Sequence, residues 1–198
     1  MKRILIAGFL VILISCTGKK TEEGDQYYDQ GEYEKALEAY DKYLTIYPRN
    51  IKTLYNRAMT YDKLGKQQEA KEDLNNLLEL EPNHLQARIT LGEIDFAAKN
   101  YEVAYYAFNK AVESHKQSSL AYVYRAKANQ KMGQIRKAYS DYNIAIRLDP
   151  KNGMAYLYRG TLFVYQKKNT SACKDFAKAK ELGVVEAEKA LAKYCGNN

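Results

Sequence analysis

The sequence contains no tryptophan, only three prolines and two histidines, and eleven glycines in 198 residues. So little proline and glycine excludes a proline-rich linker protein and a low-complexity disordered chain. The chain also lacks a Ser/His/Asp set, a glycine-rich phosphate loop and a cluster of metal ligands, because His84 and His115 are isolated. We therefore expect no enzymatic activity, no bound metal and no non-covalent cofactor.

Apolar residues make up 46% of the chain, and nineteen residues are tyrosine. A tyrosine ring can be buried while its hydroxyl group stays in contact with water. This composition is typical of a packed helical protein.

The N-terminus carries the pattern of an export signal. Lys2 and Arg3 precede an apolar run over residues 4–14, which is too short to span a bilayer in a helix of about 20 residues. The run ends in Leu13-Ile14-Ser15-Cys16, which resembles the lipobox of bacterial lipoproteins, where the cysteine becomes the diacylated new N-terminus after cleavage. The resemblance implies a cleaved signal peptide over residues 1–15, a covalent lipid on Cys16 and a tether through residue 21. The alternative is an ordinary secretory signal that happens to contain a cysteine.

The lipobox resemblance also implies a location. A lipidated Cys16 would hold the protein in the bacterial cell envelope, with the membrane reached through the lipid anchor. Thr17 stands where lipoproteins retained at an inner membrane often carry aspartate, which favours the outer membrane in a host with two membranes.

A 34-residue repeat organises the rest of the chain. The repeat is marked by turn residues that stand 34 positions apart, namely Gly31, Gly65, Lys99, Gly133 and Lys167. A small residue recurs five positions after each turn residue, at Ala36, Ala70, Ala104, Ala138 and Ala172. A large residue follows four positions later, at Tyr40, Leu74, Phe108, Tyr142 and Phe176. A methyl group lets two helices approach closely, and the large side chain fills the space beside it.

The stretches Gln30–Ala36 and Ala145–Pro150 are similar to the tetratricopeptide repeat. This resemblance implies an all-α fold, a right-handed superhelical α-solenoid of five helix-turn-helix repeats with a C-terminal capping helix. The repeats are expected at residues 22–50, 51–84, 85–118, 119–152 and 153–184. The capping helix and tail are expected at 185–198, where Val184, Ala187, Leu191 and Tyr194 share one helix face.

Arginine and aspartate recur together 16 residues apart. The pairs are Arg57 with Asp73, Arg125 with Asp141, and Arg159 with Asp175. Repeat 3 has Leu91 and Ala107 at these two positions, and repeat 1 has Glu23 and Ala39, so neither repeat carries the pair. We interpret the pairs as ion pairs between the two helices of one repeat. The alternative is two independent preferences of the family.

Repeat 3 departs from the pattern at both of its turns. It has Lys99-Asn100 where other repeats have glycine, and we expect Asn100 to take the left-handed conformation. Lys116 stands where other repeats have proline, so we expect the loop Ser114–Ser119 to be longer or looser and to be the hinge of any bending.

Cys173 and Cys195 form an even pair once Cys16 is set aside. The antiparallel packing expected of the last two helices brings the two cysteines together, and an exported protein meets an oxidising compartment. We therefore favour a disulfide over two free thiols or a metal pair, since no histidine is near.

The family resemblance implies that a partner binds in the concave groove lined by the first helix of each repeat. Transferred by repeat position, the groove residues are Tyr55, Met59, Lys63, Ile89, Glu93, Phe96, Val123, Lys127, Lys131, Leu157, Thr161 and Tyr165. This mixed surface suits an extended peptide or a helix of a partner protein, although some of these residues could simply pack between repeats. Thr21 and Asp25 replace the Lys and Asn with which some relatives clamp a terminal carboxylate, so that clamp is absent.

Charge is unequally divided. Residues 17–84 hold ten Lys or Arg and fourteen Asp or Glu, whereas residues 119–198 hold fifteen and six. The basic half could attract an acidic partner, anionic lipid or a polyanion, or simply be solvated. No nucleic-acid-reading motif is present, so we expect none to bind. The sequence favours a membrane-tethered adaptor that binds another envelope protein, and the alternative is a structural subunit of an envelope assembly or secretion complex.

Overall fold

The structure, a computed structural model, describes residues 19–196. The expected signal peptide and Cys16 therefore lie outside the described residues. Between residues 19 and 196 the chain forms eleven α-helices and no strand. The helices are α1 (Lys19–Asp29), α2 (Tyr33–Ile46), α3 (Ile51–Lys63), α4 (Gln67–Leu80), α5 (Leu85–Ala97), α6 (Tyr101–Ser114), α7 (Ser119–Lys131), α8 (Ile135–Leu148), α9 (Gly153–Tyr165), α10 (Asn169–Glu181) and α11 (Glu186–Cys195).

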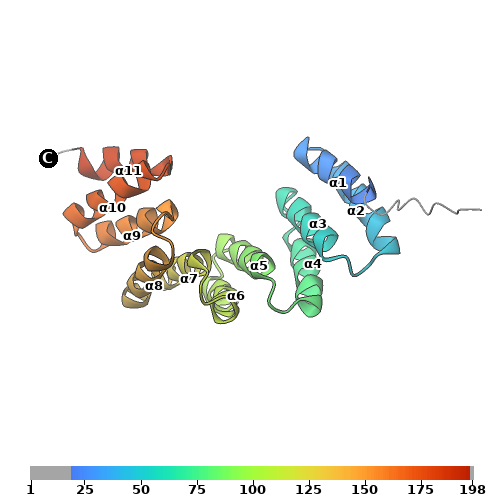
Figure 1. The fold of residues 1–198 in the computed structure, drawn as a ribbon, viewed down its shortest axis with the longest axis horizontal. Coiled ribbons are helices and arrows are strands. Elements are labelled where there is room, and N and C mark those ends of the chain that lie inside the picture. Colours follow the sequence, from blue (N-terminus) through green and yellow to red (C-terminus); the bar gives the residue numbers. More distant parts are fainter. Residues whose placement is uncertain (1–18, 197–198) are drawn as a thin grey trace, which may run out of the picture.

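Consecutive helices pack in pairs, α1 with α2 through α9 with α10, and each pair packs on the next. Figure 1 shows that the pairs follow an arch, with α3, α5, α7 and α9 toward its inner side and α4, α6 and α8 toward its outer side. The last helix, α11, packs on α10 at the end of the array. The predicted all-α solenoid is therefore confirmed.

The turn inside each repeat has the same form. Each turn has three residues, and its second residue has a positive φ: Gly31, Gly65, Lys99, Gly133 and Lys167. In repeat 3 the Asn100 N–H donates to Asp95 O at 2.9 Å and the Lys99 N–H to Phe96 O at 3.0 Å, which is a Schellman ending. The left-handed residue is Lys99, with φ of 64°, and Asn100 has φ of −81°. Our expectation for Asn100 was wrong, because the end of α5 fixes which residue must turn.

The two lysine turns give a stability prediction. An L-residue with a side chain pays about 1–2 kcal/mol in the left-handed region, and glycine avoids this cost while gaining some freedom in the unfolded chain. Lys167 has φ of 58°, whereas the neighbouring Lys168 has φ of −96°. We expect Lys167→Gly to raise the free energy of unfolding by about 1 kcal/mol and Lys168→Gly to lower it. Urea denaturation of the two variants measures the difference, and equal effects would contradict this account of the turn.

The loops between repeats are also alike. Each has four residues, including the loop after Ser114, so the expectation of a longer or looser loop there was wrong. The Ser118 side chain accepts a hydrogen bond from the Ala121 N–H at 3.2 Å and so caps α7. Asn50, His84 and Asn152 cap the other first helices in the same way. The Ser118 cap therefore maintains the loop conformation although Lys116 replaces proline.

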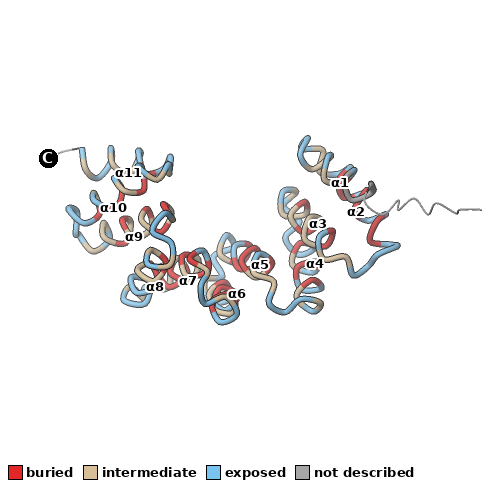
Figure 2. Tube along the Cα trace, viewed as in Figure 1, coloured by how far each residue is buried: buried red, intermediate tan, exposed pale blue. Residues whose placement is uncertain are grey.

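The core runs between the two helices of each repeat, and Figure 2 shows buried residues on the sides where helices meet. The recurring alanines and the large residues that follow them are all nearly or fully inaccessible. In repeats 1, 3 and 5 the large recurring residue is aromatic, and its ring lies directly over a glycine of the first helix. A Cβ atom added to Gly160 would lie 2.6 Å from Cε1 of Phe176, and Gly24 and Gly92 face Tyr40 and Phe108 in the same way. These glycines are therefore required by close packing and not by a turn.

A disulfide joins Cys173 on α10 to Cys195 at the end of α11, with Cα atoms 5.8 Å apart. This is the disulfide that the sequence predicted. A loop closed over 22 residues stabilises the fold by about 3 kcal/mol, mainly by restricting the unfolded chain.

Loss of this disulfide should weaken the packing of α11 on α10. We expect Cys173→Ala with Cys195→Ala to lower the free energy of unfolding by about 2–4 kcal/mol and to raise amide exchange first in α11. Dithiothreitol should give the same loss in the parent protein and no further loss in the double variant. Unchanged exchange in α11 would contradict a role in holding the cap.

Among residues 19–196, no helix is both long enough and apolar enough to cross a bilayer.

Candidate functional site

Three arginine forks hold the first helices in place. Arg125 donates from Nε and Nη2 to the two carboxylate oxygens of Asp141, at 2.9 and 2.7 Å. Its third nitrogen, Nη1, donates to Asn109 of the preceding repeat at 2.8 Å. Arg57 and Arg159 make the same bidentate contacts, and their third bonds go back to Asp41 and Asn143. Each fork therefore joins three helices and two repeats, which the sequence spacing alone did not indicate.

The junction between repeats 2 and 3 has no arginine fork. Leu91 and Ala107 replace the pair, and the residue that would receive the third bond, Asn75, remains exposed. The junction is joined instead by Lys71 of α4, whose Nζ lies 2.5 Å from a carboxylate oxygen of Asp95 on α5. Asp95 is 3% exposed, so the carboxylate of this ion pair is buried, whereas the Lys71 side chain is partly exposed.

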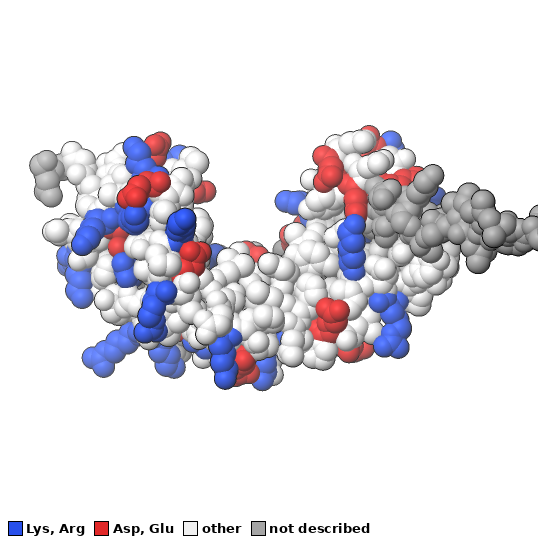
Figure 3. Space-filling view, in the orientation of Figure 1, with Lys and Arg blue, Asp and Glu red and all other residues white. Residues whose placement is uncertain are grey.

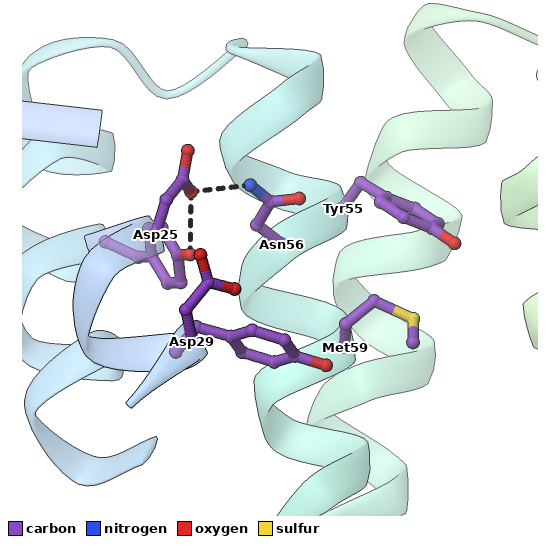
Figure 4. A pocket seen from close by; sticks show the side chains of 7 residues that line it. Asp25, Asp29, Tyr55, Asn56 and Met59 are labelled. Atoms are coloured by element: carbon purple, nitrogen blue, oxygen red, sulfur yellow. Dashed lines mark hydrogen bonds between the residues drawn. The ribbon is translucent and has the colours of Figure 1, made fainter. Parts of the chain in front are cut away.

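The first pocket of the inner face lies between α1 and α3 and has a volume of about 410 Å³. It is lined by Asp25, Tyr28, Asp29, Tyr40, Tyr55, Asn56 and Met59. Figure 4 shows Asp25 and Asp29 on one side, opposite Tyr55, Asn56 and Met59 on the other.

Asp25 is fully engaged inside this first pocket. Its carboxylate accepts hydrogen bonds from Tyr40 at 2.8 Å, Asn56 at 2.7 Å and Lys52 at 2.7 Å. Burial on its own would raise the pKa of Asp25, but these three bonds bring it below the ordinary value. Asp25 is thus ionised and internally paired, and it acts as a structural residue of the pocket wall.

The second pocket continues along the inner face, sharing Met59 with the first, and has a volume of about 340 Å³. It is lined by Met59, Asp62, Thr90, Glu93, Ile94, Phe96, Ala97, Tyr124 and Lys127. The hydroxyl of Tyr55 lies 3.3 Å from that of Thr90 and joins the walls contributed by repeats 2 and 3. The two pockets therefore adjoin at Met59 on the inner face of repeats 1 to 4, and together we call them the inner groove.

Lys127 lies among aromatic rings at the far end of the inner groove. Its Nζ is 4.8 Å from the ring centres of Tyr124 and Tyr158 and 5.3 Å from that of Phe96. Burial lowers the pKa of Lys127, and nearby Glu93 partly opposes this effect. The ammonium is thus stabilised by three ring faces and one neighbouring carboxylate.

The structure divides the expected groove residues into three groups. Tyr55, Met59, Glu93, Phe96 and Lys127 line the inner groove. Ile89, Val123 and Leu157 are 2%, 2% and 6% exposed and belong to the core between repeats, so their assignment to the groove was wrong. Lys63, Lys131 and Tyr165 are exposed and Thr161 is half-buried, and these four lie outside both pockets.

Sequence reasoning missed the contribution of repeat 1. Asp25, Tyr28 and Asp29 occupy the same repeat positions as groove residues of repeats 2 to 4. The repeat register alone could have identified them. Tyr124 was missed for a different reason, because it shares with Asn56 and Thr90 a repeat position that was not assigned to the groove.

Figure 3 shows a hollow between the two arms of the arch whose floor is mostly uncharged, while Lys and Arg gather over the C-terminal helices. Over the described residues, no group of three or more His, Cys, Asp or Glu side chains is arranged to hold a metal ion.

Comparisons with known proteins agree with the repeat register. Tetratricopeptide-repeat profiles match residues 24–65 and 51–84. The Hsp70-Hsp90 organizing protein of Triticum aestivum is 26% identical over 202 residues, which cover 83% of this chain and 35% of that protein. The curated relatives are longer, and the chain spans only 18% and 28% of the first two.

Solved structures share the fold. MamA from Desulfovibrio magneticus RS-1 aligns with a TM-score of 0.72 at 22% identity, covering 84% of this chain and 94% of that one. A tetratricopeptide repeat protein from Parabacteroides merdae ATCC 43184 aligns with a TM-score of 0.62 at 25% identity, covering 91% and 84%. The chain therefore contains tetratricopeptide repeats, and they are assembled into the solenoid fold of these proteins.

Proposed function

We propose that the protein is a lipid-anchored scaffold of the bacterial cell envelope that binds a protein or peptide segment in the inner groove. Tetratricopeptide-repeat proteins are generally scaffolds for protein interactions and not enzymes, and the proposal takes this chain to be one of them. Its function then resides in the surface that the solenoid presents.

The inner groove is the observation that carries this proposal. Its two adjoining pockets lie on repeats 1 to 4 and combine ring faces and a methionine with a few polar groups. Such surfaces suit an extended segment, because ring faces provide contact area and the polar groups fix the register.

The lipobox resemblance at Cys16 supports the anchor. The Cys173–Cys195 disulfide supports export, since such bonds persist in oxidising compartments. Replacing Cys16 with serine should move the protein from the membrane fraction to the soluble fraction. An unchanged membrane fraction would overturn the lipid anchor and leave the groove proposal standing.

Site-specific cross-linking tests the groove. A photo-crosslinking phenylalanine analogue is placed in cells at Met59, in the groove, and in a second strain at Lys137, an exposed residue of α8. We expect discrete adducts of one partner from position 59 and none from position 137. Adducts that form equally from both positions, or from neither, would overturn binding in the groove.

A second candidate function, as a structural subunit, is favoured by an apolar pocket on the outer face. The pocket has a volume of about 540 Å³, and its lining combines Leu78, Leu91, Val103, Tyr106 and Ala107 with Asn75, Glu79, Arg88 and Asp95. Val103 and Tyr106 are 54% and 64% exposed. The equivalent pocket of repeat 5 is lined by Arg159 and Asp175, where repeat 3 has Leu91 and Ala107, so the pocket of repeat 3 has a more apolar floor.

The apolar floor of the outer pocket can be replaced by copying the neighbouring repeats. Leu91→Arg with Ala107→Asp supplies the missing fork, and Asn75 already stands where Asn109 and Asn143 receive the third bond. If the protein is a subunit that uses the outer face, this variant should no longer co-purify with its assembly, while cross-linking from position 59 stays unchanged. Retention of the assembly would exclude the outer pocket as its contact.

A further inference from the structure

We infer that the first pocket of the inner groove takes a lysine or arginine side chain of the bound segment. This inference rests on the proposed function and specifies the chemistry of the partner. It follows from which charges in the groove are already compensated and which are not.

The carboxylates of the groove differ in their partners. Asp25 is paired with Lys52. Asp29 on α1 and Asp62 on α3 form no ion pair with any lysine or arginine whose side chain the structure describes. Asp29 lines the first pocket, and Asp62 lines the second pocket next to Met59, which the two pockets share.

Tyr28 lies beside Asp29 in the wall of the first pocket, and Asp62 lies in the adjoining pocket, next to the shared Met59. The pKa of Tyr28 agrees with this placement, because burial raises it and the nearby Tyr33, Tyr55, Asp62 and Asp29 raise it further. A cation in the first pocket would therefore lie against Asp29, with Asp62 on the neighbouring helix α3.

The walls of the pocket match the rest of a long basic side chain. Tyr28 and Tyr55 offer ring faces and Met59 offers an apolar, adaptable surface. Lysine and arginine carry an apolar stem that packs on such surfaces and a cationic head that is attracted to ring faces and carboxylates. The volume of about 410 Å³ leaves room for such a side chain.

The one lysine of the groove does not reverse this charge preference. Lys127 lies at the far end, among three rings and near Glu93, so its charge is already compensated within the fold. The uncompensated charge that faces the first pocket is negative. An acidic segment would place its carboxylate against Asp29 and Asp62 and is disfavoured.

A peptide array tests the inference. The probes are acetylated and amidated nonapeptides with randomised flanks whose central residue is Lys, Arg, norleucine or Glu, and the detergent-solubilised full chain is the binding protein. We expect at least fivefold more protein bound at Lys or Arg than at norleucine, and the least at Glu. The preference should weaken between 50 and 200 mM salt, because salt screens partly exposed charges.

Two double variants assign the preference to the pocket. Asp29→Asn with Asp62→Asn should bind Lys and norleucine peptides equally. Glu72→Gln with Glu79→Gln removes the same charge from the exposed side of α4 and should keep the preference. A preference for Glu, or binding that ignores the central residue, would overturn the inference and leave groove binding intact. Loss of all peptide binding together with loss of cross-linking from position 59 would overturn the proposed function as well.

Discussion

Replacing Arg125 with leucine is expected to lower the free energy of unfolding by about 3 kcal/mol. The variant leaves the carboxylate of Asp141, which is 4% exposed, with only the 3.2 Å contact from the Asn129 amide. A buried charge that has lost its counter-ion costs more than the intact pair contributes. The third bond, from Arg125 to Asn109, is lost as well, so the packing of repeat 3 on repeat 4 should weaken.

The chain itself supplies the compensating change. Repeat 3 folds with Leu91 and Ala107 at the equivalent positions. We therefore expect Arg125→Leu combined with Asp141→Ala to recover part of the lost stability, because no charge is stranded although the buried Asn129 amide loses its partner. Urea denaturation followed by circular dichroism gives both values. Lys42→Leu, which breaks an exposed pair with Glu38, serves as the control and should change stability by less than about 0.5 kcal/mol. A double variant as unstable as the single one would show that Asp141 is not the source of the loss.

The second large effect is expected at Gly160. An alanine methyl there would lie 2.6 Å from the ring of Phe176, which is fully buried and cannot move aside freely. Overpacking of this kind costs about 1–3 kcal/mol. We expect Gly160→Ala to reduce the free energy of unfolding by that amount, measured by urea denaturation.

Repeat 2 shows how the fold accommodates the methyl group. It pairs Ala58 with Leu74, where repeat 5 pairs Gly160 with Phe176. Gly160→Ala with Phe176→Leu should thus be more stable than the sum of the two single changes by about 1 kcal/mol or more. Strictly additive effects would mean that the methyl group and the ring do not compete for the same space.

The sequence predicted the register of the solenoid because the repeat signals are local. Turn residues 34 positions apart and small residues beside large ones reflect contacts within one repeat, and α3, α5, α7 and α9 begin 34 residues apart as a result. The Arg–Asp spacing could be recognised for the same reason, since both residues belong to one helix pair.

Exposure within the groove could not be predicted in this way. Tyr55, Ile89 and Val123 share one repeat position, yet Tyr55 lines the groove and the other two are buried. Whether such a residue is covered depends on how the next repeat packs on it, and this contact is not part of the 34-residue pattern.

The third bond of each arginine fork links two repeats and should therefore influence the order in which the repeats unfold. It links repeat 1 to 2, repeat 3 to 4 and repeat 4 to 5, whereas the junction between repeats 2 and 3 has no fork and is joined by the Lys71–Asp95 pair and the Tyr55–Thr90 contact. In a linear array, cooperativity is the sum of such neighbour-to-neighbour links. We therefore expect the solenoid to melt as two blocks, repeats 1–2 and repeats 3–5, which hydrogen exchange would reveal as two levels of protection. The inner groove crosses the border between these blocks, so an occupied groove would fuse them into one cooperative unit.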